Sequence, residues 1–152
     1  MAGATAPTIR AALSKDFVAV AALLLANDLP LEGVPRSMDG FLVAEHGGVI
    51  VGAIGMECYG ADALLRSAVV NAALRGTGVG TRLVDAIITE AERREAGDLW
   101  LLTTTAERWA PRFGFAVAAR EEVPASVRAS QEFRGACPDS AIIMRRVTGT
   151  SH

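Results

Sequence analysis

Three glycines at alternate positions, Gly76, Gly78 and Gly80, separate an apolar run from a long amphipathic pattern in LRSAVVNAALRGTGVGTRLVDAII, residues 65–88. Glycine lets a backbone approach a ligand closely and adopt a positive φ at little cost. The first turn of a helix carries N–H groups without intrahelical acceptors, and the helix dipole adds positive potential there. With Arg75 at its mouth, the loop is predicted to bind a pyrophosphate. An ordinary flexible connection between a strand and a helix is the alternative.

Two well-known phosphate loops do not fit these residues. A P-loop requires GxxxxGK[ST], and the only lysine of the chain is Lys15, far from the glycines. A dinucleotide fingerprint GxGxxG that began at Gly76 would need a glycine where Thr81 stands. That fingerprint also belongs to a βαβ unit with an acidic residue after its second strand. Neither of these two phosphate-loop motifs therefore accounts for the glycines.

Metal and covalent chemistry have little support in the sequence. Cys58 and Cys137 show no metal-ligand spacing, and with only His46 and His152 a zinc site is improbable, so no metal is expected. Cys137 has no histidine nearby in the sequence that would activate it as a nucleophile. Direct transfer without a covalent enzyme intermediate is favoured over a cysteine ping-pong route.

Length and composition favour one globular domain over residues 1–152, with 51% hydrophobic residues and a formal net charge of −2. The chain has no basic run, so no nucleic-acid partner is expected. Its longest apolar run, residues 17–27, is too short to span a bilayer. The first residues lack the pattern of a signal peptide. A cytoplasmic protein with reduced thiols and no membrane association is predicted.

The elements that position the glycine loop alternate between strands and helices. The predicted order is β-α-(α)-β-β-β-α-β-α-β-α-β, which favours an α/β protein with a mixed sheet covered by helices. A loop or broken helix over 29–38 follows the first helix. Strands are predicted over 8–13, 40–45, 49–58, 63–70, 98–105, 114–124 and 140–147, and helices over 14–25, 79–95, 106–113 and 125–137.

The pattern (Gln/Arg)-x-x-Gly-x-(Gly/Ala), filled by Arg75, Gly78 and Gly80, resembles the acetyl-CoA-binding signature of the GNAT N-acetyltransferase superfamily. AERWAPRFGF, residues 106–115, is similar to the short helix of the superfamily that ends in Gly-Phe. GMECYGADALLRSAVV, LWLLTTTAERW, VPASVRASQEF and CPDSAIIMRRV look like its arsenic-resistance branch, which acetylates amino-acid-like substrates. They are more distantly similar to the acetyltransferase domain of N-acetylglutamate synthase. Thr105 stands where an arginine is expected in the glutamate enzyme, which argues against glutamate as substrate.

The resemblance implies a GNAT fold with six to seven strands and acetyl-CoA as cosubstrate. In this superfamily the cosubstrate lies between the fourth and fifth strands, and its pantetheine pairs with the edge of the fourth. Backbone contacts are therefore expected at Val69 and Val70, and Val79 is expected to contribute mainly its N–H. The pyrophosphate would contact Arg75, Gly76, Thr77, Gly78, Val79, Gly80 and Thr81.

Acetyl transfer to an amine needs a base for the ammonium, a polarised carbonyl and an acid for the departing thiolate. Glu57, near the end of the third strand, is the candidate base and would act through water; a solvated glutamate at a strand end is the alternative. The tyrosine that often serves as acid in the superfamily is replaced by Ala110. Tyr59, the only tyrosine, is a weak substitute, and solvent or a backbone N–H is the other route.

Recognition of a carboxylate favours arginine. Arg66 and Ser67 lie on the fourth strand, and by alternation only one of them would face the substrate. Arg66 is the stronger candidate, with a salt bridge to Glu57 as its alternative. Thr104 and Thr105 are expected to supply hydroxyl groups, although strand propensity explains threonines there equally well.

The predicted function is an N-acetyltransferase for a small amino acid or an analogue, including arsenical or phosphinic ones, in detoxification. A protein or peptide N-acetyltransferase and a non-catalytic CoA-binding sensor are the alternatives. The expected partner is a small-molecule amine, and the resemblance makes a homodimer plausible.

Overall fold

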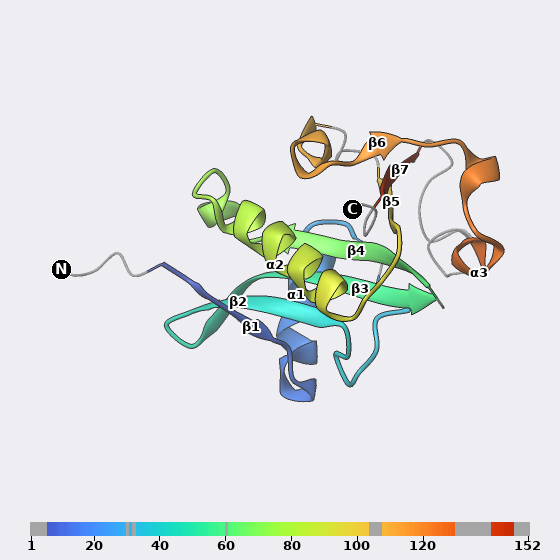
Figure 1. Ribbon diagram of the computed structural model, residues 1–152. Helices are drawn as coiled ribbons and strands as arrows, with labels where there is room; N and C mark the ends of the chain where they lie inside the picture. Colours follow the sequence, from blue (N-terminus) through green and yellow to red (C-terminus); the bar gives the residue numbers. More distant parts are fainter. Residues whose placement is uncertain are drawn as a thin grey trace. The chain divides into compact units, whose positions relative to one another are not determined.

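The computed structural model describes residues 6–29, 31, 33–59, 61–103, 108–129 and 141–147. Within them a seven-stranded sheet has the order β1-β2-β3-β4-β5-β7-β6 (Figure 1). None of the helices in the described ranges has the length and apolar character needed to cross a membrane. The strands are β1 Thr8–Ala11, β2 Phe41–His46, β3 Val49–Tyr59, β4 Asp62–Val70, β5 Leu99–Thr103, β6 Ala116–Val117 and β7 Ile142–Arg146. The helices are α1 Phe17–Ala26, α2 Val79–Arg93 and α3 Ala125–Arg128, with 3-10 turns η1 Ser14–Asp16, η2 Ala72–Leu74, η4 Ala110–Phe113 and η5 Arg120–Glu122.

The chain forms two compact units. The first comprises Met1–Gly55 and Ser67–Ile87, and the second comprises Met56–Arg66 and Ile88–His152. Strands β3 and β4 and helix α2 each begin in one unit and end in the other. Each unit has its own hydrophobic core.

In the first unit, α1 and α2 pack on opposite faces of the strands. Leu24 of α1 is fully buried in a cluster with Ala53 of β3. A Cβ added to the preceding residue, Gly52, would lie 3.0 Å from Cδ1 of Leu83 on α2. Because successive residues of a strand point to opposite faces, Ala53 faces α1 and Gly52 faces α2. The cluster beneath α1 contains Val20, Leu24, Met38, Phe41, Val43, Ala53 and Val69.

The start of α1 is fixed by a buried aspartate. Asp16, 5% exposed, accepts hydrogen bonds from the backbone N–H of Leu13 at 2.7 Å and from Arg10 Nη1 at 2.8 Å. Arg10 also donates through Nε to Glu45 Oε1 at 2.7 Å, which ties β1 to β2. These bonds from Arg10 hold the pKa of Asp16 below its usual value and raise the pKa of Arg10.

The core of the second unit surrounds Trp100 on β5. Trp100 is 1% exposed and lies under the guanidinium of Arg145, 5.2 Å from the ring centre. β5 runs antiparallel to β7, from the pair Leu99–Arg146 to the pair Thr103–Ile142. Around Trp100 are Leu64, Leu102, Val123, Val127 and Ile143.

Most predicted elements are present, with corrections to their bounds. Of the helix predicted over 106–113, the structure shows the 3-10 turn η4 over Ala110–Phe113, and residues 104–107 lie outside the described residues. The first strand ends at Ala11 rather than Leu13, because the Leu13 N–H bonds to Asp16 instead of a neighbouring strand. Helix α2 ends at Arg93 rather than Glu95, since Glu95 has a left-handed φ of 59°. Residues 114–124 do not form one long strand. β6 pairs with β7 at two positions, after which Glu122 accepts from the Ala119 N–H and closes the turn η5. Of the helix predicted over 125–137, α3 covers Ala125–Arg128, and residues 130–137 lie outside the described residues.

Candidate functional site

The glycine loop lies between η2 and α2, within the first unit. Gly76 and Gly78 have φ values of 84° and 94°. A Cβ added to either would have no atom within 4 Å, so both face open space. Positive φ is costly for residues with a Cβ, and this explains why the loop uses glycine at these two positions.

The N–H groups of Gly76 and Gly78 have no acceptor among the described residues, whereas Thr77 N–H bonds to the Leu74 carbonyl at 3.2 Å. Helix α2 begins at Val79, so the positive end of its dipole adjoins the loop. The Val79 side chain itself is buried at 2% exposure. The loop therefore presents backbone donors, while its one large apolar side chain packs inside.

Side chains near the loop fasten it rather than fill it. Arg75 Nη2 donates to Asn27 Oδ1, and Asn27 Nδ2 donates to the Leu23 carbonyl at 2.8 Å. Thr77 Oγ1 donates to the Leu74 carbonyl at 2.5 Å. Asn27, at the C-terminal end of α1, has no role in the sequence prediction, because its partner lies 48 residues away. The Arg75 backbone N–H donates to the Ala72 carbonyl at 3.3 Å, and the other guanidinium N–H groups of Arg75 have no partner in the described part of the chain.

The end of β4 adjoins the loop. A Cβ added to Gly80 would lie 3.6 Å from Val70 Cγ2. The Val69 carbonyl oxygen would lie 3.1 Å from a Cβ on Gly52, which fixes the position of β4 against β3. The parallel register of β4 with β5 runs from Ala63–Leu99 to Leu65–Leu101, so Val69 and Val70 lie beyond it.

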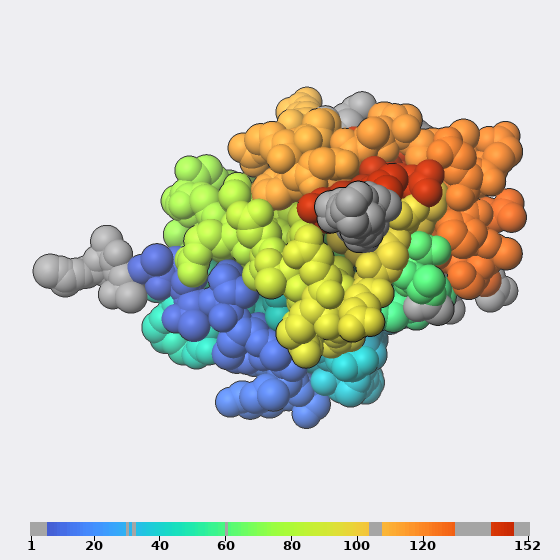
Figure 2. Space-filling view, in the orientation of Figure 1, coloured from blue at the N-terminus to red at the C-terminus, as the bar shows by residue number. Residues whose placement is uncertain are grey.

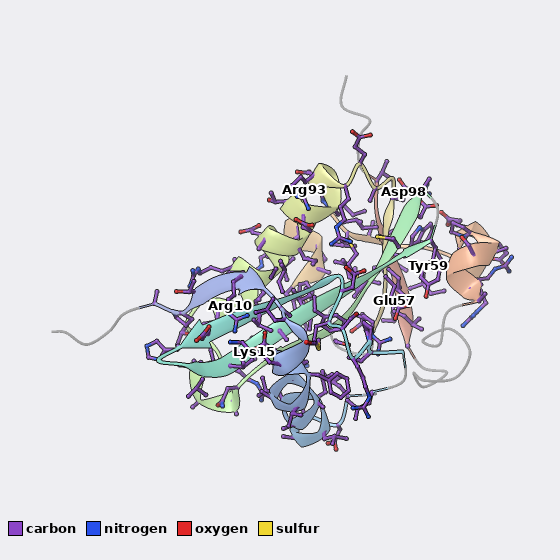
Figure 3. The ribbon with its side chains drawn as sticks, turned by 90° about the horizontal axis from the view of Figure 1, so that it is seen from below. Arg10, Lys15, Glu57, Tyr59, Arg93 and Asp98 are labelled. Carbon is purple, nitrogen blue, oxygen red and sulfur yellow. The ribbon has the colours of Figure 1, made fainter. Side chains whose placement is uncertain are left out.

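A second candidate site in the other unit is built from side chains. Glu57 Oε2 accepts from Arg66 Nη1 at 2.6 Å, and Glu57 Oε1 accepts from the Tyr59 hydroxyl. The Arg66 side chain has no exposed surface, and that of Glu57 is 17% exposed. Figure 3 shows Glu57 and Tyr59 side by side on β3, as expected for residues two apart on a strand. We refer to Glu57, Tyr59 and Arg66 as the Glu57 cluster.

The salt bridge considered for Arg66 is present, and its partner is Glu57. A buried guanidinium needs an anion, and Glu57 supplies it. The spacing of Glu57 and Tyr59 in the sequence was the available sign that the two side chains share a face. The sequence did not indicate that Tyr59 would donate to the carboxylate.

The sequence analysis assumed that Arg66 and Ser67 point to opposite faces of a regular strand. Ser67 has a left-handed φ of 58°, which interrupts the regular pleat of β4 at this residue. Arg66 is buried and Ser67 is partly buried. Thr104 and Thr105 lie outside the described residues.

Residues 37–117 match the family model described as "Acetyltransferase (GNAT) domain". The match covers more than half of the chain and includes both the glycine loop and the Glu57 cluster. The chain belongs to the GNAT acetyltransferase family.

Several solved structures share the fold. N-acetylglutamate synthase from Neisseria gonorrhoeae, in complex with coenzyme A and N-acetyl-glutamate, is 25% identical with a TM-score of 0.81, over 97% of this chain and 36% of that one. The chain thus spans about a third of that enzyme. Rv2747 from Mycobacterium tuberculosis, in complex with CoA and NLQ, is 24% identical with a TM-score of 0.79, over 94% and 100% of the two chains. Ard1 from Thermoplasma volcanium is 22% identical with a TM-score of 0.71, over 95% and 99%. A search of curated proteins found no match.

The GNAT fold predicted from the sequence is confirmed. In this acetyltransferase the position expected for a tyrosine acid, Ala110, is fully buried in η4. Trp109 and Phe113 flank it, with ring centres 5.9 Å apart in an edge-to-face contact. Ala110 is therefore a packing residue.

Proposed function

We propose that this acetyltransferase transfers an acetyl group from acetyl-CoA to the amine of a small amino acid or an amino-acid analogue. The observation that supports an amino-acid acceptor is the similarity, over nearly the whole chain, to an N-acetylglutamate synthase in complex with coenzyme A and N-acetyl-glutamate. The amine nitrogen would attack the acetyl carbonyl carbon directly. The C–S bond then breaks, the amide forms, and the proton lost by the amine balances the one gained by the thiolate.

The glycine loop suits the pyrophosphate of acetyl-CoA. Two glycines with positive φ have N–H groups without an acceptor among the described residues, and a Cβ at either position would meet open space. The start of α2 adds the positive end of a helix dipole. Arg75 contributes a positive charge at the edge of the loop. Val69 and Val70, beyond the register with β5, are the proposed partners of the pantetheine. The pyrophosphate contacts are assigned to Arg75, Gly76, Thr77, Gly78, Val79, Gly80 and Thr81.

The Glu57 cluster is the proposed acceptor site. Glu57 is assigned as the base, acting through water, because both of its carboxylate oxygens already accept a hydrogen bond. Arg66 is assigned to the carboxylate of the acceptor, which would join or replace Glu57 beside the guanidinium. Ser67, Thr104 and Thr105 are assigned to polar contacts with the same acceptor.

Resistance to arsenical or phosphinic amino-acid analogues is the proposed biological role. Its support is the resemblance of the segments around the Glu57 cluster to the arsenic-resistance branch. A single domain acting in the cytoplasm is part of the same proposal.

The test is thiol release from acetyl-CoA across a panel of free amino acids, their phosphinic and arsenical analogues, and short peptides. Release with free amino acids or analogues alone supports the proposal. Release with peptides alone would replace it with peptide acetylation, and tight CoA binding without release would replace it with a sensor. Gly78→Glu is the control for cofactor-dependent release. A thermal-shift screen of the same compounds with CoA present would rank the acceptors.

A further inference from the structure

Helix α1 exposes apolar side chains on the face opposite its core contacts. The helix, FVAVAALLLA, contains no charged residue. Val20 and Leu24 are fully buried, whereas Val18 is 76% exposed and Leu25 is 62% exposed. Ala22, between them, is also exposed. An amphipathic surface helix usually has polar residues on its outer face. In the space-filling view, the segment of α1 is part of the molecular surface (Figure 2).

The exposed residues form one stripe. Val18, Ala22 and Leu25 are separated by four and three positions, so they lie next to one another along one side of the helix. The stripe is symmetric along the sequence, because Val18 and Leu25 are equally far from the midpoint between Ala21 and Ala22. Small residues at that midpoint allow a second helix to approach closely.

The charges at the two ends of α1 have the same symmetry. Lys15, in η1 before the helix, and Asp28, just after its end, are equally far from the same midpoint. Both are exposed, and neither has a salt bridge within the described ranges. Lys15 lies at the positive end of the helix dipole and Asp28 at the negative end, so each charge is unfavourably placed relative to the dipole of its own helix, while Lys15 is attracted by the buried Asp16.

We propose that α1 packs antiparallel against α1 of a second copy of this chain, about a twofold axis at Ala21 and Ala22. Val18 then faces Leu25 of the second copy, and Lys15 faces Asp28 of the second copy. Each charge also moves to the favourable end of the other helix dipole. The face is self-complementary, as a twofold interface requires. Helix α1 of a second copy thus complements the apolar stripe and both charged ends.

The contact is small. A stable interface buries on the order of 1,200–2,000 Å² in total, and two ten-residue helices alone bury less than this. The dimer is therefore expected to be weak, with a dissociation constant on the order of micromolar.

The first experiment is sedimentation velocity of the full chain over a series of concentrations. The wild-type chain is expected to shift from monomer to dimer as concentration rises. Leu25→Glu is expected to stay monomeric, and Val117→Glu is the matched control because Val117 is 67% exposed but lies on β6. A wild-type monomer at every concentration, or a dimer that Leu25→Glu leaves intact, would overturn the interface.

The second experiment reverses the charges. Lys15→Asp and Asp28→Lys are each expected to weaken the dimer about tenfold. Each substitution places the charge that its own dipole end favours. Because Asp28 has a left-handed φ of 58° and Lys15 is attracted by the buried Asp16, urea unfolding of each variant is measured alongside. The double variant, and an equimolar mixture of the two single variants, are expected to dimerise again, since both restore opposite charges across the axis. Equal dimerisation by the wild type, the two single variants and the double variant would rule out the antiparallel arrangement.

Discussion

The glycine loop and the Glu57 cluster, the two proposed ligand sites, differ in which groups they offer to a polar ligand. The loop, in the first unit, offers backbone N–H groups on an exposed surface and uses residues without side chains to do so. The Glu57 cluster, in the second unit, offers side-chain groups that are largely buried and already bonded to one another. A site made of free N–H groups gains its partner only with the ligand, whereas a buried ion pair must be satisfied in the folded chain itself. The loop is therefore expected to affect binding, and the cluster to affect both stability and binding.

The largest effect is expected from Gly78→Glu. The carboxylate would point into the open space in front of the loop and repel the diphosphate, so affinity for CoA should fall about a thousandfold, near 4 kcal/mol. Isothermal titration calorimetry measures this. Gly48→Glu is the control, because Gly48 also has a positive φ of 80° and open space around its Cβ position. Both variants should lose about 1 kcal/mol of stability through backbone strain. Equal CoA affinity in the two variants would contradict the loop assignment.

Arg66→Met should reduce the free energy of unfolding by about 3 kcal/mol, because it leaves the Glu57 carboxylate partly buried with only the Tyr59 hydroxyl as donor. Urea denaturation measures the loss. Adding Glu57→Gln to this variant should recover most of it, since no uncompensated charge remains. Wild-type stability in Arg66→Met would show that the pair is not needed for folding.

The same double variant separates structure from recognition. If Arg66 binds the carboxylate of the acceptor, the double variant should regain stability while its affinity for the amino acid, measured by calorimetry with CoA present, stays below that of the Glu57→Gln single variant. Equal affinity in the two variants would assign Arg66 to the fold alone.

Tyr59→Phe should cost about 1 kcal/mol of stability, the usual value of one hydrogen bond, because Glu57 keeps its bond to Arg66. If Tyr59 also supplies a proton to the leaving thiolate, kcat should fall while both KM values stay constant. Stopped-flow thiol release on the purified variant distinguishes the two roles. An unchanged kcat would leave Tyr59 as a partner of Glu57 only.

The smallest effect is expected at an ion pair whose arginines are exposed, since the side chains of Arg93 and Arg94 are 69% and 32% exposed and that of Arg66 is fully buried. Glu90 on α2 bonds to Arg93 and Arg94, and these bonds lower its pKa from 4.5 to about 2. The stabilisation is present above pH 4.5 and is lost as the pH falls towards 2, because the folded state then binds the proton less readily than the unfolded state. Glu90→Gln should cost about 0.5 kcal/mol at pH 7 and less at pH 3.

Urea unfolding at both pH values measures that difference. Glu92→Gln on the same helix is the control, since Glu92 is 57% exposed and its only salt bridge within the described residues, to Arg146, is 3.8 Å long. If Glu90→Gln lowered the free energy of unfolding as much as Arg66→Met does, burial of the arginine would not explain the larger effect expected for Arg66→Met.

Sequence patterns within a few neighbouring residues were enough to predict helix α2 and the glycine loop before it. The period of α2, its apolar face and the preceding glycines depend on neighbours within a few residues, so the helix start at Val79 and the loop at 75–81 could be located. Elements whose ends depend on distant partners were less accurate. The first strand ends early because of Asp16, and the strand predicted over 114–124 is limited to the two residues that pair with β7.

By itself, the sequence determined the order of elements, the GNAT family and the position of the glycine loop, because glycine spacing and hydrophobic period act locally. Only the tertiary structure decided that Glu57 joins Arg66 to Tyr59, that Asn27 fastens Arg75, and that Val18 and Leu25 stay exposed on an apolar helix. Those outcomes depend on which side chains meet across strands and helices. The energy of burying a charge or an apolar surface is fixed by that meeting, not by the residues next to it in the chain.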